Sequence, residues 1–129
     1  MGTLWRSAKL FGAAFIFTVG RRYERQPSDT MKSWRTVPLF NFDTVADLLA
    51  HVPFSCPLIG IELDEKANPI QDFVHPERCV YLLGAEDHGL TTEERTLCHK
   101  LVQLPGESSM NVASAGTVVM YDRWLGNAR

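Results

Sequence analysis

Residues 79–94, CVYLLGAEDHGLTTEE, form the stretch of sequence that says most about the fold. The apolar run from Cys79 to Leu83 predicts a buried strand that ends at Gly84. The polar loop after it leads to Thr91 and Glu94, whose spacing matches a capping box and predicts the start of a helix. A strand, a loop and a helix in this order are typical of an α/β protein with a parallel sheet.

The rest of the chain repeats this alternation. Further strands are predicted at Ala13–Val19, Thr36–Phe40, Pro57–Leu63 and Leu101–Leu104, with a polar loop between Leu63 and Pro69. Helices are predicted at Thr3–Phe11, 43–51, 91–99 and Met110–Leu125, with Asp43 or Thr44 and Ser108 or Ser109 as N-caps and Gly12 and Gly126 as stops. We therefore expect a mostly parallel sheet with helices on both faces.

The composition fits one soluble globular domain of 129 residues, with 45% hydrophobic and 22% charged residues. Three cysteines (Cys56, Cys79 and Cys98) cannot all pair within the chain, which favours reduced thiols and a cytoplasmic location. The apolar opening could be read as a signal peptide, but no A-x-A-like cleavage site follows it. The cysteines and histidines lack the paired spacing of zinc ligands, so no metal site is expected.

Charge is distributed unevenly along the chain. Residues 1–40 carry seven basic and two acidic side chains, whereas the remainder carries six basic and thirteen acidic ones. Five of these basic residues lie in one expected loop, together with Tyr23 and Trp34: Arg21, Arg22, Arg25, Lys32 and Arg35. Phosphate contacts and aromatic stacking of this kind suit RNA. An ordinary solvated loop remains the alternative.

Three loops follow the carboxyl ends of predicted strands, where open parallel sheets bind their ligands. They come after Leu63, Leu83 and Leu104. The second loop begins with Gly84, which allows a close backbone approach, and Glu86, which can accept hydrogen bonds. The third, PGESSMN, leads into the predicted C-terminal helix, whose free N–H groups suit a carboxylate or an adenine nitrogen.

Taken together, YLLGAEDHGLTTEE and LVQLPGESSMNVASAGTVVMYD resemble the two C-terminal motifs of the SpoU-like (TrmH) RNA ribose methyltransferases of the SPOUT class. The matching positions are Leu82–Leu83, Gly84–Glu86, Gly89–Leu90, Leu104–Pro105 and Ser109–Val112. The resemblance implies an α/β fold with a C-terminal trefoil knot. It also implies a homodimer that is formed through the C-terminal helix.

For the activity, the resemblance implies methyl transfer from S-adenosylmethionine to a ribose 2′-hydroxyl of RNA. We expect tRNA rather than rRNA as the substrate, because the sequence shows no added RNA-binding domain. The expected cofactor-binding residues are Ile61, Glu62, Leu83, Gly84, Gly89, Leu104, Ser109 and Met110. The expected catalytic residues are Arg6, Glu86 and Asn111, of which Arg6 acts on the 2′-hydroxyl or its adjacent phosphate. A knotted protein that binds cofactor or RNA without catalysis is the alternative.

The beginning of the chain, MGTLWRSAKLFG, is similar to the family motif N-x-G-x-x-x-R through Gly2 and Arg6. The asparagine of the motif falls one position before Met1, and the first strand of the family is also missing. We therefore interpret residues 1–129 as a single SPOUT methyltransferase domain that is truncated at its N-terminus. One hypothesis is that Met1 is an internal methionine of a longer protein.

Overall fold

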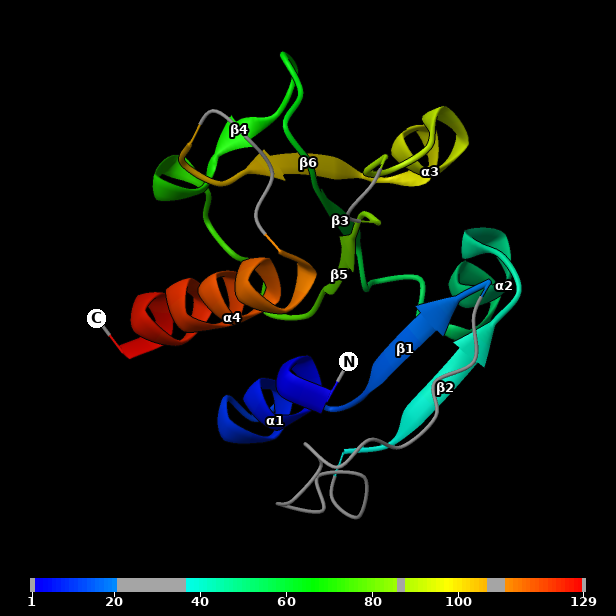
Figure 1. The fold of residues 1–129 in the computed structure, drawn as a ribbon, viewed down its shortest axis with the longest axis horizontal. Coiled ribbons are helices and arrows are strands. Elements are labelled where there is room, and N and C mark those ends of the chain that lie inside the picture. Colours follow the sequence, from blue (N-terminus) through cyan, green and yellow to red (C-terminus); the bar gives the residue numbers. More distant parts are fainter. Residues whose placement is uncertain (1, 21–36, 86–87, 107–110, 129) are drawn as a thin grey trace.

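Helices and parallel strands alternate along the chain (Figure 1). The computed structural model describes residues 2–20, 37–85, 88–106 and 111–128. In chain order the elements are α1 (Gly2–Leu10), β1 (Ile16–Val19), β2 (Leu39–Phe42), α2 (Val45–His51), β3 (Leu58–Ile61), β4 (Asn68–Pro69), the 3₁₀ helix η2 (Ile70–Asp72), β5 (Val80–Leu83), α3 (Thr92–Leu97), β6 (Lys100–Gln103) and α4 (Val112–Ala128).

The strands form two parallel sheets, and in this respect the prediction of one sheet is wrong. The larger sheet has the order β4-β6-β3-β5, and the smaller one pairs β1 with β2. Within the described part of the chain, β1 and β5 lie at sheet edges and are not paired with each other. Side chains join the two sheets instead, because Phe15 and Phe17 pack on a core that contains Leu58 and Val80.

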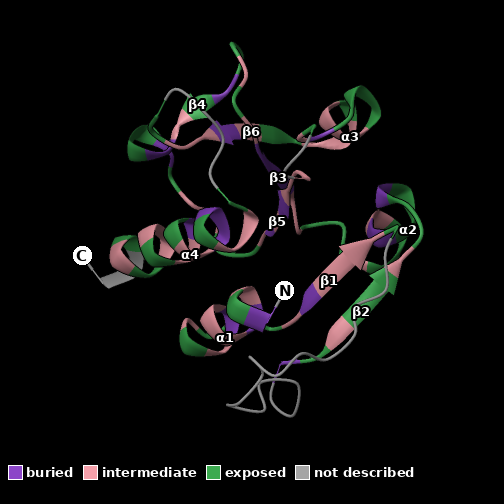
Figure 2. Cartoon of the chain, in the orientation of Figure 1, coloured by how far each residue is buried: buried purple, intermediate pink, exposed green. Residues whose placement is uncertain are grey.

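Helices cover both faces of the larger sheet, as predicted. All four residues of β3 are buried, and successive side chains point to opposite faces. Leu58 packs with Leu48 of α2 on one face, and Ile59 packs with Val119 of α4 on the other. Buried residues therefore concentrate on β3 and on the inner sides of the helices (Figure 2).

Several local predictions are confirmed by hydrogen bonds or backbone angles. The side chain of Thr44 accepts a hydrogen bond from the backbone N–H of Asp47, so it caps α2. Thr91 and Glu94 form the complete capping box of α3. Gly12 has a φ of 77° just after α1, the left-handed conformation that favours glycine at a helix end.

Other predicted boundaries differ from the structure. Helix α4 begins at Val112 rather than Met110 because the side chain of Asn111 accepts hydrogen bonds from the N–H groups of Ala113 and Ser114. Gly126 does not end α4, which continues to Ala128. Ser108 and Ser109 lie outside the described residues.

Smaller shifts affect the other elements. Strand β2 begins three residues later than predicted and β6 one residue earlier, and α3 ends before His99. The predicted polar loop before Pro69 contains the two-residue strand β4 at its end. Each of these boundaries depends on pairing with distant residues, for example Asn68 with Val102 and Pro69 with Gln103.

Helices α1 and α4 lie side by side (Figure 1). Gly116 allows the close contact, since a Cβ atom there would lie 2.3 Å from Cδ1 of Leu4. The hydroxyls of Ser7 and Thr117 form a hydrogen bond of 2.8 Å across the same interface. Trp5 fixes the other side of α1 by donating its indole N–H to the carbonyl of Val37 at 2.7 Å. The residue before Arg6 and the residue after it are thus both anchored.

A cluster of polar side chains anchors the C-terminal half of α4. His75 contacts the Tyr81 hydroxyl and the Asp122 carboxylate, both at 2.6 Å. Arg123 donates hydrogen bonds to the carbonyls of Pro76 and Glu77. Burial is the main cause that raises the pKa of Tyr81 well above its ordinary value. This cluster stabilises the packing of α4 against the segment before β5.

No helix in the described ranges is long and apolar enough to cross a membrane.

Candidate active site

A pocket lies at the carboxyl ends of three neighbouring strands of the larger sheet. It has about 500 Å³ of empty space, part of which is open to solvent. The first turns of α4 close one side of it. Its lining residues are Ile61, Glu62, Leu63, Leu83, Gly84, Ala85, Gly89, Leu104, Val112 and Ala115.

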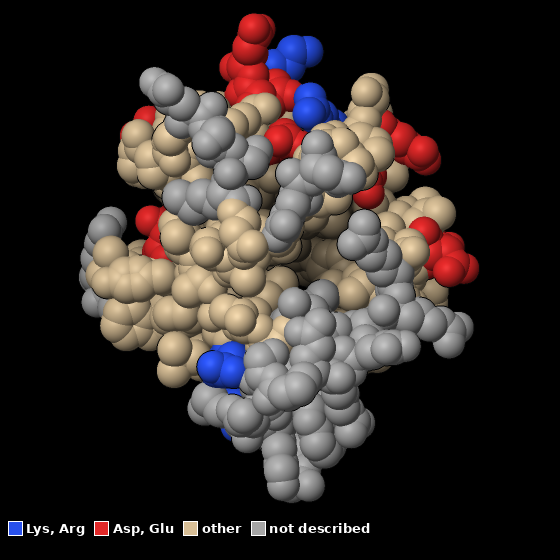
Figure 3. Space-filling view, viewed as in Figure 1, with Lys and Arg blue, Asp and Glu red and all other residues tan. Residues whose placement is uncertain are grey.

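The walls of this pocket are mainly aliphatic. Ile61, Leu83 and Leu104 come from the ends of β3, β5 and β6, so the sheet order brings them together. Glu62 supplies the carboxylate of the lining. In the space-filling view, charged side chains of the described residues gather near the loop between β3 and β4 (Figure 3). Such a pocket suits a ligand with a substantial apolar surface.

Gly84 contacts the backbone of the same loop, whereas the sequence suggested that it allows a ligand to approach. A Cβ atom at this position would lie 2.6 Å from the carbonyl carbon of Gly89 and 2.7 Å from the backbone nitrogen of Leu90. The close approach that requires glycine is therefore to the chain's own backbone. A backbone hydrogen bond of 2.8 Å from Gly89 to the Ala85 carbonyl holds the same turn. Glycine at position 84 keeps the two ends of this loop together at the pocket wall.

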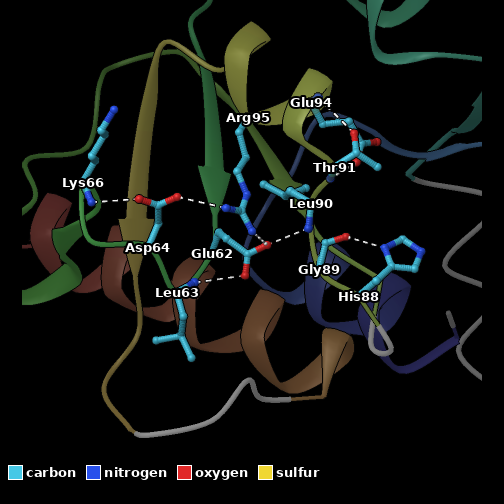
Figure 4. A network of polar contacts seen from close by, with 10 residues as sticks. All are labelled: Glu62, Leu63, Asp64, Lys66, His88, Gly89, Leu90, Thr91, Glu94 and Arg95. Carbon is cyan, nitrogen blue, oxygen red and sulfur yellow. Dashed lines mark hydrogen bonds and ion pairs between the residues drawn. The ribbon is translucent and has the colours of Figure 1, made fainter.

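Glu62 lines the pocket, and its carboxylate also holds the loop after β5. Its Oε2 accepts a hydrogen bond of 2.6 Å from the N–H of Leu90, and its Oε1 accepts one of 3.1 Å from the N–H of Leu63 (Figure 4). Only 8% of the side chain is exposed. Burial of a carboxylate is costly unless hydrogen bonds and a cation compensate it. The cation is Arg95, whose Nη2 lies 3.5 Å from Oε2.

The structure thus places six of the eight predicted cofactor residues around one pocket: Ile61, Glu62, Leu83, Gly84, Gly89 and Leu104. The other two, Ser109 and Met110, lie outside the described residues. The pocket also contains residues that sequence reasoning missed, among them Val112 and Ala115. Their spacing of three residues places them on one face of α4, and this signal was available in the sequence because both residues lie in the predicted helix Met110–Leu125.

The predicted catalytic residues are not all found at the pocket. Arg6 is partly buried in α1 and is not among the lining residues, although α1 packs on the helix that closes the pocket. Asn111 hydrogen-bonds the backbone of α4 immediately before Val112, so its position is next to the lining. Glu86 and the basic residues of the predicted RNA-binding loop (Arg21, Arg22, Arg25, Lys32 and Arg35) lie outside the described residues.

Fold and pocket together define an α/β protein with a ligand site at the ends of its parallel strands. The model of the SpoU rRNA Methylase family matches residues 1–121, and the chain belongs to this family. This match confirms the resemblance carried by the two C-terminal motifs.

Two curated relatives are bacterial enzymes. The 23S rRNA (guanosine-2'-O-)-methyltransferase RlmB of Acinetobacter baylyi is 34% identical over 82 residues, which are 61% of this chain and 32% of that protein. The 23S rRNA (uridine(2479)-2'-O)-methyltransferase of Streptomyces viridochromogenes is 27% identical over 135 aligned positions, covering 95% of this chain and 47% of that protein. The chain spans less than half the length of either relative.

The fold is shared with solved structures. An AdoMet-bound rRNA methyltransferase from Sinorhizobium meliloti superposes with a TM-score of 0.82 at 22% identity, over 95% of this chain and 49% of that one. The A. aeolicus TrmH/SpoU tRNA modifying enzyme gives a TM-score of 0.86 at 17% identity, over 98% of this chain and 68% of that one. At these identities the likeness shows the arrangement of helices and strands.

Proposed function

We propose that this protein transfers a methyl group from S-adenosylmethionine to a ribose 2′-hydroxyl of RNA. The observation that carries the proposal is the pocket, in which residues of both C-terminal family motifs meet at the ends of β3, β5 and β6. Family membership and the names of the two curated relatives, both 2′-O-methyltransferases, support the same reaction.

The residues around the pocket fit the cofactor. Ile61, Leu83 and Leu104 offer aliphatic contacts for an adenosine moiety, and the turn at Gly84 offers backbone polar groups. Ser109 and Met110, which follow Leu104 in the motif, are proposed to complete this site. S-adenosylmethionine would supply an electrophilic methyl group on a sulfonium, so that the protein's task is to align the hydroxyl with that carbon.

Arg6 is proposed to act on the RNA. The contacts of Leu4 with Gly116 and of Ser7 with Thr117 hold α1 on the helix whose first turns close the pocket. A guanidinium keeps its proton in nearly all protein settings. Arg6 is therefore suited to orient a phosphate and to stabilise the developing oxyanion, rather than to remove the proton of the hydroxyl. Glu86 and Asn111 are proposed to shape the site by hydrogen bonding.

We also propose that the protein acts as a homodimer through α4. Three large apolar side chains on this helix remain exposed, with exposed fractions of 37% for Val118, 44% for Tyr121 and 53% for Trp124. Their spacing of three residues forms one apolar strip, which is the pattern of a helix that packs on a partner. Leu10 at the end of α1 is 75% exposed, and Phe11 contacts Tyr121, so the strip extends onto α1.

The finer features of the family are part of the same proposal. Residues 1–129 would form one SPOUT methyltransferase domain in the cytoplasm, with the C-terminal segment threaded as a trefoil knot. The basic loop from Arg21 to Arg35 would contact RNA phosphates. The substrate is tRNA, which the sequence favours, or rRNA, which the names of both curated relatives specify.

Two measurements test the function in sequence. Isothermal titration measures whether S-adenosylmethionine binds to the protein. Transfer of a radiolabelled methyl group is then measured on purified tRNA and rRNA, with an Arg6→Ala variant beside the natural protein. We expect saturable binding for both proteins, and labelled RNA with the natural protein alone. Saturable binding without labelled RNA contradicts the proposed activity and favours the non-catalytic binding protein.

A further inference from the structure

A cluster of charged side chains next to the pocket joins the segment after β3 to helix α3. It contains Glu62 at the end of β3, Asp64 two residues later, and Arg95 in α3 (Figure 4). Arg95 is not among the residues that line the pocket, and nothing in its local sequence marks it as functional. Its two partners precede it by about thirty residues, so only the fold brings the three side chains together.

The Glu62 carboxylate is pressed directly against the turn that forms the pocket wall. A Cβ atom at Gly89 would meet its Oε2 at 2.3 Å, which shows that the turn and the carboxylate are in tight contact. The short hydrogen bond from Leu90 to Oε2 fixes the next residue of the turn. The position of Glu62 and the position of Gly89–Leu90 are therefore coupled.

Arg95 connects this carboxylate to the loop after β3. One guanidinium nitrogen, Nη2, lies 3.5 Å from Glu62, and the other, Nη1, donates to Asp64 Oδ2 at 3.1 Å. The second Asp64 oxygen accepts a hydrogen bond from the N–H of Lys66. A planar guanidinium can bridge two carboxylates in a fixed geometry, which a lysine cannot reproduce.

From this geometry we infer that Arg95 is a positioning residue for cofactor binding, which holds Gly89 and Leu90 at the wall of the pocket through Glu62. The inference rests on the proposed function, since it assumes that S-adenosylmethionine occupies this pocket. Without the guanidinium, a nearly buried carboxylate loses its cation and moves toward water. The hydrogen bond to Leu90 is then lost, and the turn at Gly89 leaves the wall.

The test compares Arg95→Gln with Arg95→Lys and with a control, Arg78→Gln. Arg78 is an exposed arginine just before β5, at the end of the strand opposite the pocket, so its substitution makes the same change in charge elsewhere. Each variant is measured by isothermal titration with S-adenosylmethionine and by hydrogen exchange of peptides that cover residues 84–97, without cofactor. Steady-state methyl transfer separates KM for the cofactor from kcat.

For Arg95→Gln we expect a cofactor Kd and KM raised about tenfold, with little change in kcat, because the nearly buried Glu62 carboxylate loses a cation whose own side chain is 37% exposed. Exchange at the Leu90 amide becomes faster in the same variant. Arg95→Lys keeps the positive charge, and its affinity for the cofactor should fall only about threefold because the ammonium group still pairs with one of the two carboxylates. Arg78→Gln leaves the Kd and the exchange unchanged.

Two results overturn the inference. One is an Arg95→Gln variant whose Leu90 exchange equals that of the natural protein, and this result is decisive even if S-adenosylmethionine fails to bind to any of the proteins. The other is an equal loss of affinity in Arg78→Gln, which indicates a general effect of charge. Failure of the natural protein to bind the cofactor contradicts the proposed function, whereas the exchange experiment still decides whether Arg95 holds the loop.

Discussion

Replacement of Gly84 by alanine places a methyl group against the backbone of the opposite side of the turn. The added Cβ would lie 2.6 Å from the Gly89 carbonyl carbon and 2.7 Å from Gly89 Cα and Leu90 N. Relief to an ordinary contact of about 3.4 Å requires a backbone shift of about 0.8 Å. A shift of this size away from Glu62 lengthens the hydrogen bond from Leu90 from 2.6 Å to about 3.4 Å, outside the usual range of N–H···O bonds.

The expected change in the free energy of unfolding follows from the clash and from the weakened hydrogen bond of Leu90. Overpacking costs about 1–3 kcal/mol, and a hydrogen bond to a charged group contributes about 1.5–3 kcal/mol. The two costs do not add in full, because the shift that relieves the clash is the same shift that weakens the hydrogen bond. We therefore expect a loss of about 2–3 kcal/mol in the free energy of unfolding. For a domain of this length the melting temperature should fall by roughly 8–12 °C.

The assay is urea denaturation followed by circular dichroism, with Gly126→Ala as the matched control. Gly126 lies within α4, and a Cβ atom there would meet no atom within 4 Å. Alanine at this position should stabilise the protein by up to about 1 kcal/mol because of its helix propensity. A Gly84→Ala variant that unfolds at the same urea concentration as the natural protein and binds S-adenosylmethionine with the same affinity would show that the contact of residue 84 with Gly89 and Leu90 is not tight.

Three further predictions address other parts of the molecule. Trp5→Phe removes the hydrogen bond to Val37 and should cost about 1–2 kcal/mol in urea denaturation; an unchanged midpoint would contradict this anchor. Trp124→Glu should convert the proposed dimer to a monomer in light scattering, and a variant that stays dimeric excludes this strip as the interface. Burial and the nearby Glu94 raise the pKa of Cys98 to about 11. Since the thiolate is the reactive form, its alkylation by iodoacetamide at pH 8 should be about a hundredfold slower than in concentrated urea, and equal rates would disprove the shift.

Local signals in the sequence were sufficient where a few neighbouring residues decide the structure. The capping box of Thr91 and Glu94 and the cap at Thr44 depend on side chains that reach backbone groups three residues away. The buried strands β3 and β5 could be predicted because they read as continuous apolar runs. Since parallel strands present their carboxyl ends at one edge, the loops after Leu83 and Leu104 could be predicted to meet there. The family resemblance then predicted Ile61, Leu83 and Leu104 as pocket residues.

The remaining features depend on contacts between distant residues. Whether the strands form one sheet or two depends on whether the edges of β1 and β5 pair, and no residue pattern within either strand predicts this pairing. The start of α4 was misplaced because three serine or asparagine residues compete as caps, and only the hydrogen bonds of Asn111 identify the one used. The contact of Gly84 with Gly89 and the ion pairs of Arg95 likewise exist only after the loop has folded onto β3.

The central claim, methyl transfer to a ribose hydroxyl of RNA, is tested most directly by the chemical identity of the product. Purified tRNA and rRNA are incubated with the protein and labelled S-adenosylmethionine, digested to nucleosides and separated by chromatography with mass spectrometry. The label should appear in a 2′-O-methylnucleoside, and Arg6→Ala should abolish it. Label in a methylated base, or no label in either RNA from a protein that binds the cofactor, would rule out methyl transfer to a ribose hydroxyl by this protein.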